Sequence, residues 1–498
     1  MALGPLNNTT GHTRILLDLR KDMLDLQRQL GTGRASETYG GLGSGRNSSL
    51  STNAKLSDIT AYQSTISLVQ IRLDVGDQAL GRLSDLGNEV KTGALTGEYS
   101  LQGDGQTIEQ LAARLRLDEA VAMLNSRADD RYLFGGNQVD NPPVETADVI
   151  LDGSNGRDGL LTLIEERKAA DLGTGDMGRL TTTATATDFT VSEDGVHPFG
   201  LKLASVTTDI VGATTTGPTG SPPSTTVTLG ANQPVEGDTV RFTFNLPDGT
   251  QTEIELTAVT GTPEDGQFQI GATVAGSIAN LDTAVQSEIQ RVAKSELAAA
   301  SAITASGEFF DGTAGSPPLR VDGPPFDTAT GQIAGTASNT VIWYKGSTST
   351  GNPRLTAEAT VDDGLDVAYG VEASEEPFRW LMQNVAVFAA ETFDATDPDE
   401  SDRFDALRTR VGTALNYPPG VQSINAVRVD IGIGASIMDQ ASQRHDDSEA
   451  LLQDLKATVE GVDTNEIAAE LLTVQTRLET SYEVTSIIAS LNLSNYLR

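Results

Sequence analysis

The two ends of the chain carry apolar residues at alternating steps of three and four. The spacing runs over residues 16–30 and 59–83 in the first part of the chain. It returns over residues 424–459 and 467–488 in the last part. Such steps place one narrow apolar seam along a single face of a helix, and a seam of this kind is typical of a helix that packs against a partner helix. The sequence therefore predicts a chain whose helical ends pair, and this organisation favours assembly over catalysis.

The seams of the first and last predicted helices provide the candidate subunit-packing residues. Within the chain, we expect the seam of the last helix to pack against that of the first. The last turns stay apolar at an end where a helix normally frays, so we expect other molecules to cover them. The candidates are Leu16, Leu19, Met23, Leu26, Leu30, Ile467, Leu471, Val474, Leu478, Tyr482 and Ile488.

Charge and hydropathy narrow the classes of partner. The formal net charge is −35, from 34 basic and 69 acidic residues. This balance argues against nucleic acid and anionic membranes as partners, because both are bound through clustered Lys and Arg. No run approaches the length of apolar sequence that spans a membrane, so no transmembrane helix is predicted. The first residues lack the charged and apolar regions of a secretory signal peptide, so we expect none.

Cysteine is absent from the 498 residues. Its absence excludes disulfides, thiolate chemistry and cysteine-type zinc sites. It fits a cytosolic protein, and it equally fits a protein that is exported unfolded through a narrow conduit. Composition alone leaves both interpretations open.

Helices are expected to dominate both ends of the chain. A Gly- and Ser-rich break without regular structure is expected over 31–49, and Asp463 with Glu466 forms a capping-box pattern at the start of the last helix. The predicted helices cover 12–30, 50–91, 107–128, 376–392, 400–416, 421–460 and 463 to nearly the last residue.

The middle of the chain is predicted to be β-rich. Its Thr-rich segments alternate apolar and polar residues, and Pro-Asp-Gly at 247–249 indicates a hairpin. One Ala-rich helix is predicted over 274–303, and Pro-rich stretches bracket a nested unit at about 224–312. The predicted strands cover 187–192, 225–229, 238–245, 251–259 and 340–345.

These elements predict an α+β fold in three parts. Residues 1–33 and 463–498 would form a terminal helical inner-core domain. Residues 34–137 and 366–462 would form a helical bundle. Residues 138–365 would form a β-rich outer domain that contains the nested α/β insert.

No set of residues predicts a catalytic, cofactor or metal site. His12, His197 and His445 are far apart in the sequence. Residues 152–158 alternate like half of a calcium loop, but the bidentate Glu that such a loop requires is missing. The acidic segment 394–402 could hold a cation weakly, and we interpret it as a solvated loop.

Three segments, in order along the chain, resemble the bacterial flagellin family. Residues 26–34, LQRQLGTGR, resemble the N-terminal stretch of flagellins, and residues 459–475 resemble their C-terminal pattern. The segment between them, residues 132–136, is more discriminating, because it is similar to a motif of the hook–filament junction branch, the hook-associated proteins. The ending at 490–497 is also similar to that branch. This middle segment consists of Tyr132, Leu133, Phe134, Gly135 and Gly136.

The chain departs from the common family pattern after Arg34. Most members carry Asp-Asp-Pro or Asp-Asp-Ala there, whereas this chain has YGGLGSGR at 39–46. This variant is similar to that of alphaproteobacterial junction proteins, and it leaves filament flagellin as an alternative. The predicted insert at 224–312 resembles an uncharacterised insert of some alphaproteobacterial flagellins.

The resemblance implies a secreted structural protein of the extracellular bacterial flagellum, exported by the type III apparatus and polymerised at the growing tip. Its terminal helices would form a coiled-coil tube around the channel, and the β-rich domain would point outward. The implied partners are further copies, the hook-side junction protein, flagellin and an export chaperone. No enzyme activity is expected. The alternatives are filament flagellin and a surface adhesin with a helical stalk.

Overall fold

A computed structural model describes residues 6–348 and 351–496. The protein is mixed α/β, with 52% of the residues in helices and 17% in strands, and it has helices at both ends and sheets in the middle. The predicted distribution of helices and sheets is confirmed at this level. None of the helices in the described residues is long and apolar enough to cross a membrane.

The chain divides into two compact units. The first comprises the chain up to Val69, the segment Ala359–Val367 and the chain from Ser436 onward. The second comprises Gln70–Glu358 and Ala368–Ala435. The finer three-part division expected from the sequence remains a prediction.

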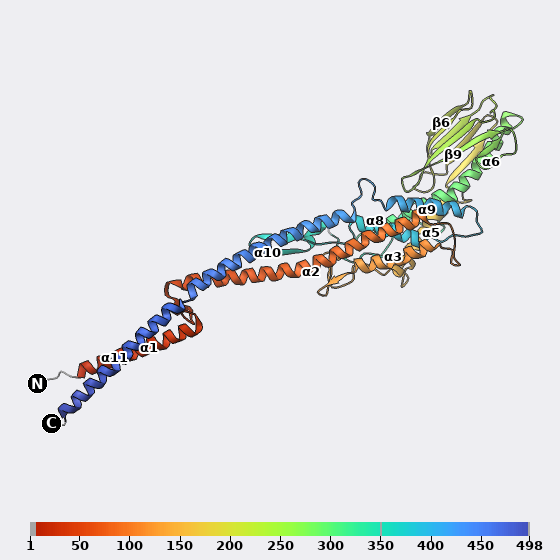
Figure 1. The fold of residues 1–498 in the computed structure, drawn as a ribbon. Coiled ribbons are helices and arrows are strands. Elements are labelled where there is room, and N and C mark those ends of the chain that lie inside the picture. Colours follow the sequence, from red (N-terminus) through yellow and green to blue (C-terminus); the bar gives the residue numbers. More distant parts are fainter. Residues whose placement is uncertain (1–5, 349–350, 497–498) are drawn as a thin grey trace. The chain divides into compact units, whose positions relative to one another are not determined.

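The first unit is built mainly from helices that lie side by side (Figure 1). α1 lies beside α11, and parts of α2 and α10 complete the unit with a short hairpin, β13–β14. Both α2 and α10 continue from one unit into the other. The bounds are α1 (Leu6–Thr32), a 3-10 turn η1 (Tyr39–Gly45), α2 (Arg46–Thr96), β13 (Glu358–Asp362), β14 (Leu365–Ala368), α10 (Ile424–Glu460) and α11 (Thr464–Tyr496).

The break after α1 lies against the break between α10 and α11. Arg34 forms a bridge with Gly461, and the Val462 N–H donates to the Gly33 carbonyl at 3.2 Å. Gly33 has a φ of +68°, which favours glycine. A Cβ at Gly461 would lie 2.3 Å from the carbonyl oxygen of Ala457. The turn after α1 is therefore fixed by the turn between α10 and α11.

The break predicted over 31–49 is shorter than expected. The first helix continues to Thr32, residues Tyr39–Gly45 form a 3-10 turn, and α2 begins at Arg46. The hydroxyl of Ser36 contributes local bonds in this segment, since it donates to the Thr38 carbonyl at 2.9 Å and accepts from the Thr38 N–H. The expectation that no regular element forms here is wrong, because such bonds and the contact with Gly461 order the chain.

The second unit contains a group of packed helices. α3 packs on α8, α8 on α7, and α7 on α5. Thr107 and Gln110 form a capping box at the start of α3. The bounds are α3 (Ile108–Leu124), β1 (Arg127–Ala128), β2 (Arg131–Tyr132), α4 (Ala147–Asp152), α5 (Leu160–Leu172), α7 (Ala298–Asp311), β11 (Leu319–Val321), β12 (Gln332–Ala334), η3 (Pro353–Thr356), α8 (Glu376–Ala390) and α9 (Glu400–Ala414).

The second unit also contains two four-stranded sheets with a common core. Their strand orders are β10-β9-β8-β5 and β3-β4-β7-β6, and every pair is antiparallel except β10 with β9. Both sheets and α6 contribute buried residues to one core, which we call the sandwich core. The bounds are β3 (Leu180–Ala184), β4 (Asp188–Glu193), β5 (Lys202–Thr208), β6 (Thr214–Thr219), β7 (Ser224–Thr228), β8 (Thr239–Asn245), β9 (Gln251–Val259), β10 (Gln267–Gln269), α6 (Val274–Val292) and a π-helical turn (Ala293–Leu297).

Four of the five predicted strands are confirmed, each to within a residue, as β4, β7, β8 and β9. The fifth, at 340–345, is wrong, because this segment makes only single bridges, at Thr340 and Tyr344. The nested unit expected at about 224–312 remains a prediction; β7, at its expected start, pairs with β4 and β6, and the sandwich core includes Leu180.

Candidate functional site: the paired terminal helices

The first and last helices form an antiparallel pair. Leu26, Ile467 and Val474 are buried together in one small apolar cluster. Farther along the pair, Leu19 approaches the segment that follows Thr473, so falling numbers in α1 meet rising numbers in α11, which is the arrangement of two helices that run in opposite directions. We call this contact the terminal seam. It brings together residues separated by most of the chain length, as the spacing of apolar residues predicts.

The structure places the sequence-predicted packing residues at three levels of burial. Leu26, Ile467, Val474 and Leu478 are buried. Leu16, Leu19, Met23 and Leu471 are partly buried, and the last three pack against the cluster around Leu26. The exposed members are Leu30, at 37%, and Tyr482, at 52%. The side chain of Ile488 lies outside the described residues.

Several large apolar side chains on the same two helices face solvent and do not belong to the predicted seam. The signal that could have found them is the run of consecutive apolar residues Ile15, Leu16 and Leu17, which cannot all lie on one face. Each of the six is at least 43% exposed. They are Ile15, Leu17, Leu24, Leu472, Val484 and Ile487.

A groove of about 780 Å³ lies between α1 and α11. Its apolar lining comes from Ile15, Leu16, Leu19 and Val484. Four threonines also line it, and each donates its hydroxyl to the carbonyl one turn earlier on α11, so their hydrogen-bonding needs are met within the helix. The groove can therefore receive apolar side chains without leaving these hydroxyls unpaired.

Charged groups lie at the edge of the terminal seam and at the turn that closes it. The Arg28 guanidinium donates to Asp25 at 2.7 Å and lowers the pKa of that carboxyl. At the turn, the Ser49 hydroxyl donates to Glu460 and lowers the pKa of Glu460. The described residues include no group of three or more His, Cys, Asp or Glu side chains that could hold a metal ion.

The two histidines whose side chains the structure describes, His197 and His445, belong to different units. The His445 ring stacks on Tyr62, and its Nε2 lies 2.7 Å from the carbonyl oxygen of Val361, which only accepts, so Nε2 carries a proton. His197 lies in the second unit, where its Nε2 contacts Asp194 at 2.6 Å. The side chain of His12 lies outside the described residues.

The segment Tyr132–Gly136 has a packing role in the second unit. Phe134 is fully buried and packs edge-on against Phe378, with the ring centroids 5.8 Å apart. A Cβ at Gly135 would lie 2.1 Å from the carbonyl oxygen of Gln138. Gly136 has a φ of +60°, and a Cβ there would lie 2.3 Å from the Ser347 hydroxyl. Both glycines are therefore required by the local geometry.

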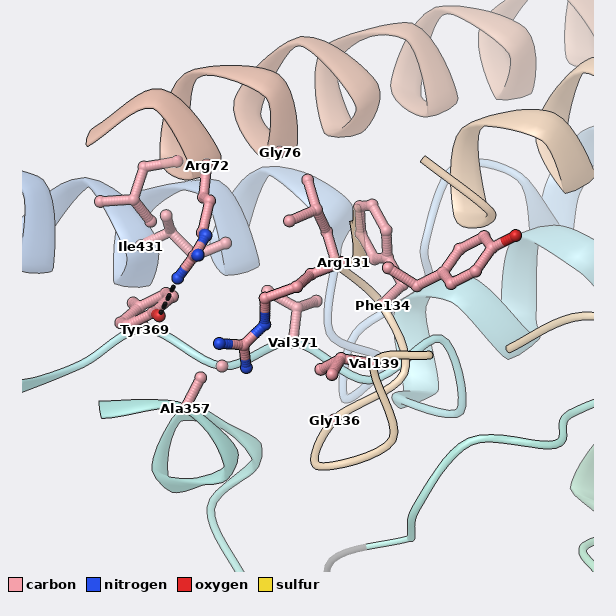
Figure 2. A pocket seen from close by; sticks show the side chains of 14 residues that line it. Arg72, Gly76, Arg131, Phe134, Gly136, Val139, Ala357, Tyr369, Val371 and Ile431 are labelled. Atoms are coloured by element: carbon pink, nitrogen blue, oxygen red, sulfur yellow. Dashed lines mark hydrogen bonds between the residues drawn. The ribbon is translucent and has the colours of Figure 1, made fainter. Parts of the chain in front are cut away.

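The same segment lines a small cavity of about 50 Å³, which we call the arginine pocket (Figure 2). A pocket for a small metabolite usually has a volume of roughly 300 Å³ or more. Arg72 and Arg131 reach into it from different elements, and Tyr369 accepts a hydrogen bond from Arg72. The cavity is too small for a metabolite and large enough for water or a small ion.

No protein-family model matches this chain, and no curated protein matches its sequence. The geometry of the terminal seam and of the arginine pocket therefore provides the structural basis for assigning a function.

Proposed function

We propose that the chain is a structural protein of the bacterial flagellum that polymerises through α1 and α11 at the junction between hook and filament. The observation that carries the proposal is the terminal seam. It pairs the two ends of the chain, and it leaves a second set of apolar side chains exposed on the same helices. The flagellin resemblance of the same two ends supports the proposal from the sequence.

The energetic argument concerns what the monomer leaves exposed. Fully burying a Leu, Ile or Val side chain stabilises a protein by about 1.5–3 kcal/mol. The exposed side chains of α1 and α11 include Leu17 at 61% and Leu472 at 65%. Helices from neighbouring copies would cover these side chains and fill the groove between α1 and α11. Each added subunit would then gain apolar burial at both helices.

The junction branch is favoured over filament flagellin by the segment Tyr132–Gly136. Phe134 of this segment is buried, a side chain at Gly135 would clash with Gln138 and one at Gly136 would be strained, so this sequence suits this local structure. Further copies, the hook-side junction protein, flagellin and an export chaperone remain the proposed partners. Secretion to the extracellular flagellum is part of the proposal.

Immunogold labelling with an antibody against residues 180–270 tests the position. We expect label in a short collar between hook and filament, and we expect loss of the protein to leave hooks without filaments. Label along the whole filament would select filament flagellin instead. Label on the cell body away from flagella would contradict the proposal and favour the adhesin.

A further inference from the structure

The arginine pocket has an unusual charge balance. Of its 14 lining residues, Arg72 and Arg131 carry charge, and no Asp or Glu is among them. The remaining lining is mostly apolar, with Leu73, Val371 and Ile431 as examples. Neither arginine forms an ion pair within the described part of the chain. Two cations therefore face one small cavity in a protein whose net charge is −35.

Arg72 differs from the other arginines whose side chain has a buried N–H group without a hydrogen-bond partner. In the described residues there are five such arginines, and four of them also form an ion pair with a carboxylate. Arg72 does not, and its Nε is buried without a partner. Its Nη1 donates to the Tyr369 hydroxyl at 3.4 Å, a long bond. The four paired arginines are Arg28, Arg354, Arg379 and Arg403.

A buried donor without an acceptor is destabilising, and such a group calls for water or an ion nearby. A guanidinium matches an oxyanion better than it matches water, because its planar set of donors can engage two oxygens at once. Arg131 comes from β2 and Arg72 from α2, and both reach the same space in Figure 2. One anion between them would reduce their mutual repulsion and accept from the free Nε.

We propose that the arginine pocket binds a small oxyanion of the size of phosphate or sulfate. The cavity volume of about 50 Å³ excludes a nucleotide or sugar phosphate held inside it. Arg72 and Arg131 supply the charge, and the Tyr369 hydroxyl supplies one further donor. The site lies within the second unit, and the proposal does not depend on flagellar assembly.

Calorimetric titration of the purified full-length chain with inorganic phosphate in a chloride buffer tests the proposal. We expect saturable binding, and we expect Arg131→Gln to weaken it about tenfold or more, the loss that corresponds to one charge-assisted hydrogen bond. Arg131 is exposed, so this variant is expected to fold. Arg72→Gln should weaken binding similarly, and Arg131→Lys should restore part of it.

Arg428→Gln is the matched control. Arg428 also belongs to the second unit and loses the same charge, but its guanidinium binds Asp77 and does not line the pocket. Equal weakening in this variant would overturn the proposal, because the effect would then come from net charge alone. Absence of saturable binding to the unaltered chain would overturn it as well. If Arg131→Gln instead abolished self-association while phosphate had no effect, the occupant would be a carboxylate of a second copy.

Discussion

The sandwich core and the terminal seam differ in how much of their apolar surface the monomer buries. In the sandwich core, residues from both sheets and α6 are buried, and Phe242, Phe244 and Leu256 have no exposed surface. In the terminal seam, Leu26, Ile467 and Val474 each retain 8% exposure. The seam is one side chain wide, whereas the sandwich core is enclosed from several directions.

The difference indicates which region needs other molecules. A paired helix with a narrow seam gains little stability from its partner, and isolated helices are marginal in water. The sandwich is complete within one chain, because sheets and α6 close around its core. We infer that folding of the sandwich and order in the terminal helices are separable properties. Changes in the terminal seam and changes in the sandwich core should therefore have different effects on polymerisation and on folding.

Leu478→Asp should abolish polymerisation. Leu478 is 7% exposed on α11, and an aspartate there would place a carboxylate in the terminal seam. Burying even a neutral polar group unpaired costs about 1–3 kcal/mol, and a charge costs more. The cost recurs in every subunit, so sedimentation should find no polymer while the sandwich still melts cooperatively.

Glu479→Gln is the control for this variant. Glu479 is exposed, and in the described chain its side chain receives a bond from Gln475 on the same helix. This variant should polymerise normally. Polymerisation of Leu478→Asp at the unaltered rate would mean that α11 takes no part in the subunit contact.

Phe242→Ala should have the opposite pattern. The Phe242 ring is fully buried and packs edge-on against Phe189, with centroids 5.9 Å apart. Removing a buried Phe side chain costs about 3–5 kcal/mol. Denaturant unfolding should show this loss in the sandwich, and polymerisation should be retained below its melting temperature. Loss of polymerisation while the sandwich is still folded would contradict the separation of the two regions.

Glu460→Gln should weaken the turn that closes the terminal seam, and the effect should depend on pH. The hydrogen bond from Ser49 lowers the pKa of Glu460 below its ordinary value near 4.5, with further contributions from Asn53, Lys456 and Arg34. A lowered folded-state pKa means that the carboxylate stabilises the fold above the unfolded-state pKa. This stabilisation disappears as the pH falls through the folded-state value.

The difference in melting temperature between Glu460→Gln and the unaltered chain should therefore be constant at neutral pH and shrink below about pH 4.5. The corresponding loss in the free energy of unfolding should be under about 1 kcal/mol, because solvent screens the charges at this site. Asp454→Asn, at an exposed position on the same helix, should show no such dependence. A difference that stays constant down to acid pH would exclude Glu460 as the titrating group.

Periodicity predicted the elements whose two faces differ. β8 and β9 alternate buried and less buried residues, and their predicted bounds agree with the structure. The seams of α1 and α11 were equally visible, because one face is covered and the other is not. The exposed apolar residues of these helices were missed because the seam accounts for only one face.

Periodicity failed where burial involves charge or irregular backbone. Helix α5 was missed, because it buries the charged residues Glu166, Arg167 and Asp171, which disguise its apolar face. Arg167 and Asp171 are held in an ion pair at 2.7 Å, a contact that no spacing rule reveals. The apolar run at 340–345 predicts a strand, yet Trp343 is buried there by side-chain packing and donates to the Phe310 carbonyl.

The arginine pocket could not be predicted from the sequence. Arg72, Arg131 and Tyr369 belong to separate segments, and none of them stands in a motif that specifies an anion site. Only the folded second unit brings them to one cavity. The segment 132–136 was recognised, but its resemblance pointed to a family and gave no account of the buried Phe134 or the strained glycine.

The smallest expected effect on polymerisation comes from removing the sandwich entirely. The chain enters and leaves it at nearly the same place, since a Cβ at Gly178 would lie 3.3 Å from the Leu297 side chain. A deletion of residues 179–296, closed by a short Gly/Ser linker, should leave α5, α7 and α8 packed on one another, because their contacts do not pass through the sheets. The contacts that are lost include the ion pair of Arg410 with Asp248, so the second unit should melt at a lower temperature.

Polymerisation of this deletion protein should continue, since the deletion leaves α1 and α11 intact. A folded, monomeric deletion protein that fails to polymerise would show that the sandwich takes part in assembly, and the contrast between a self-sufficient sandwich and an incomplete terminal seam would then be wrong.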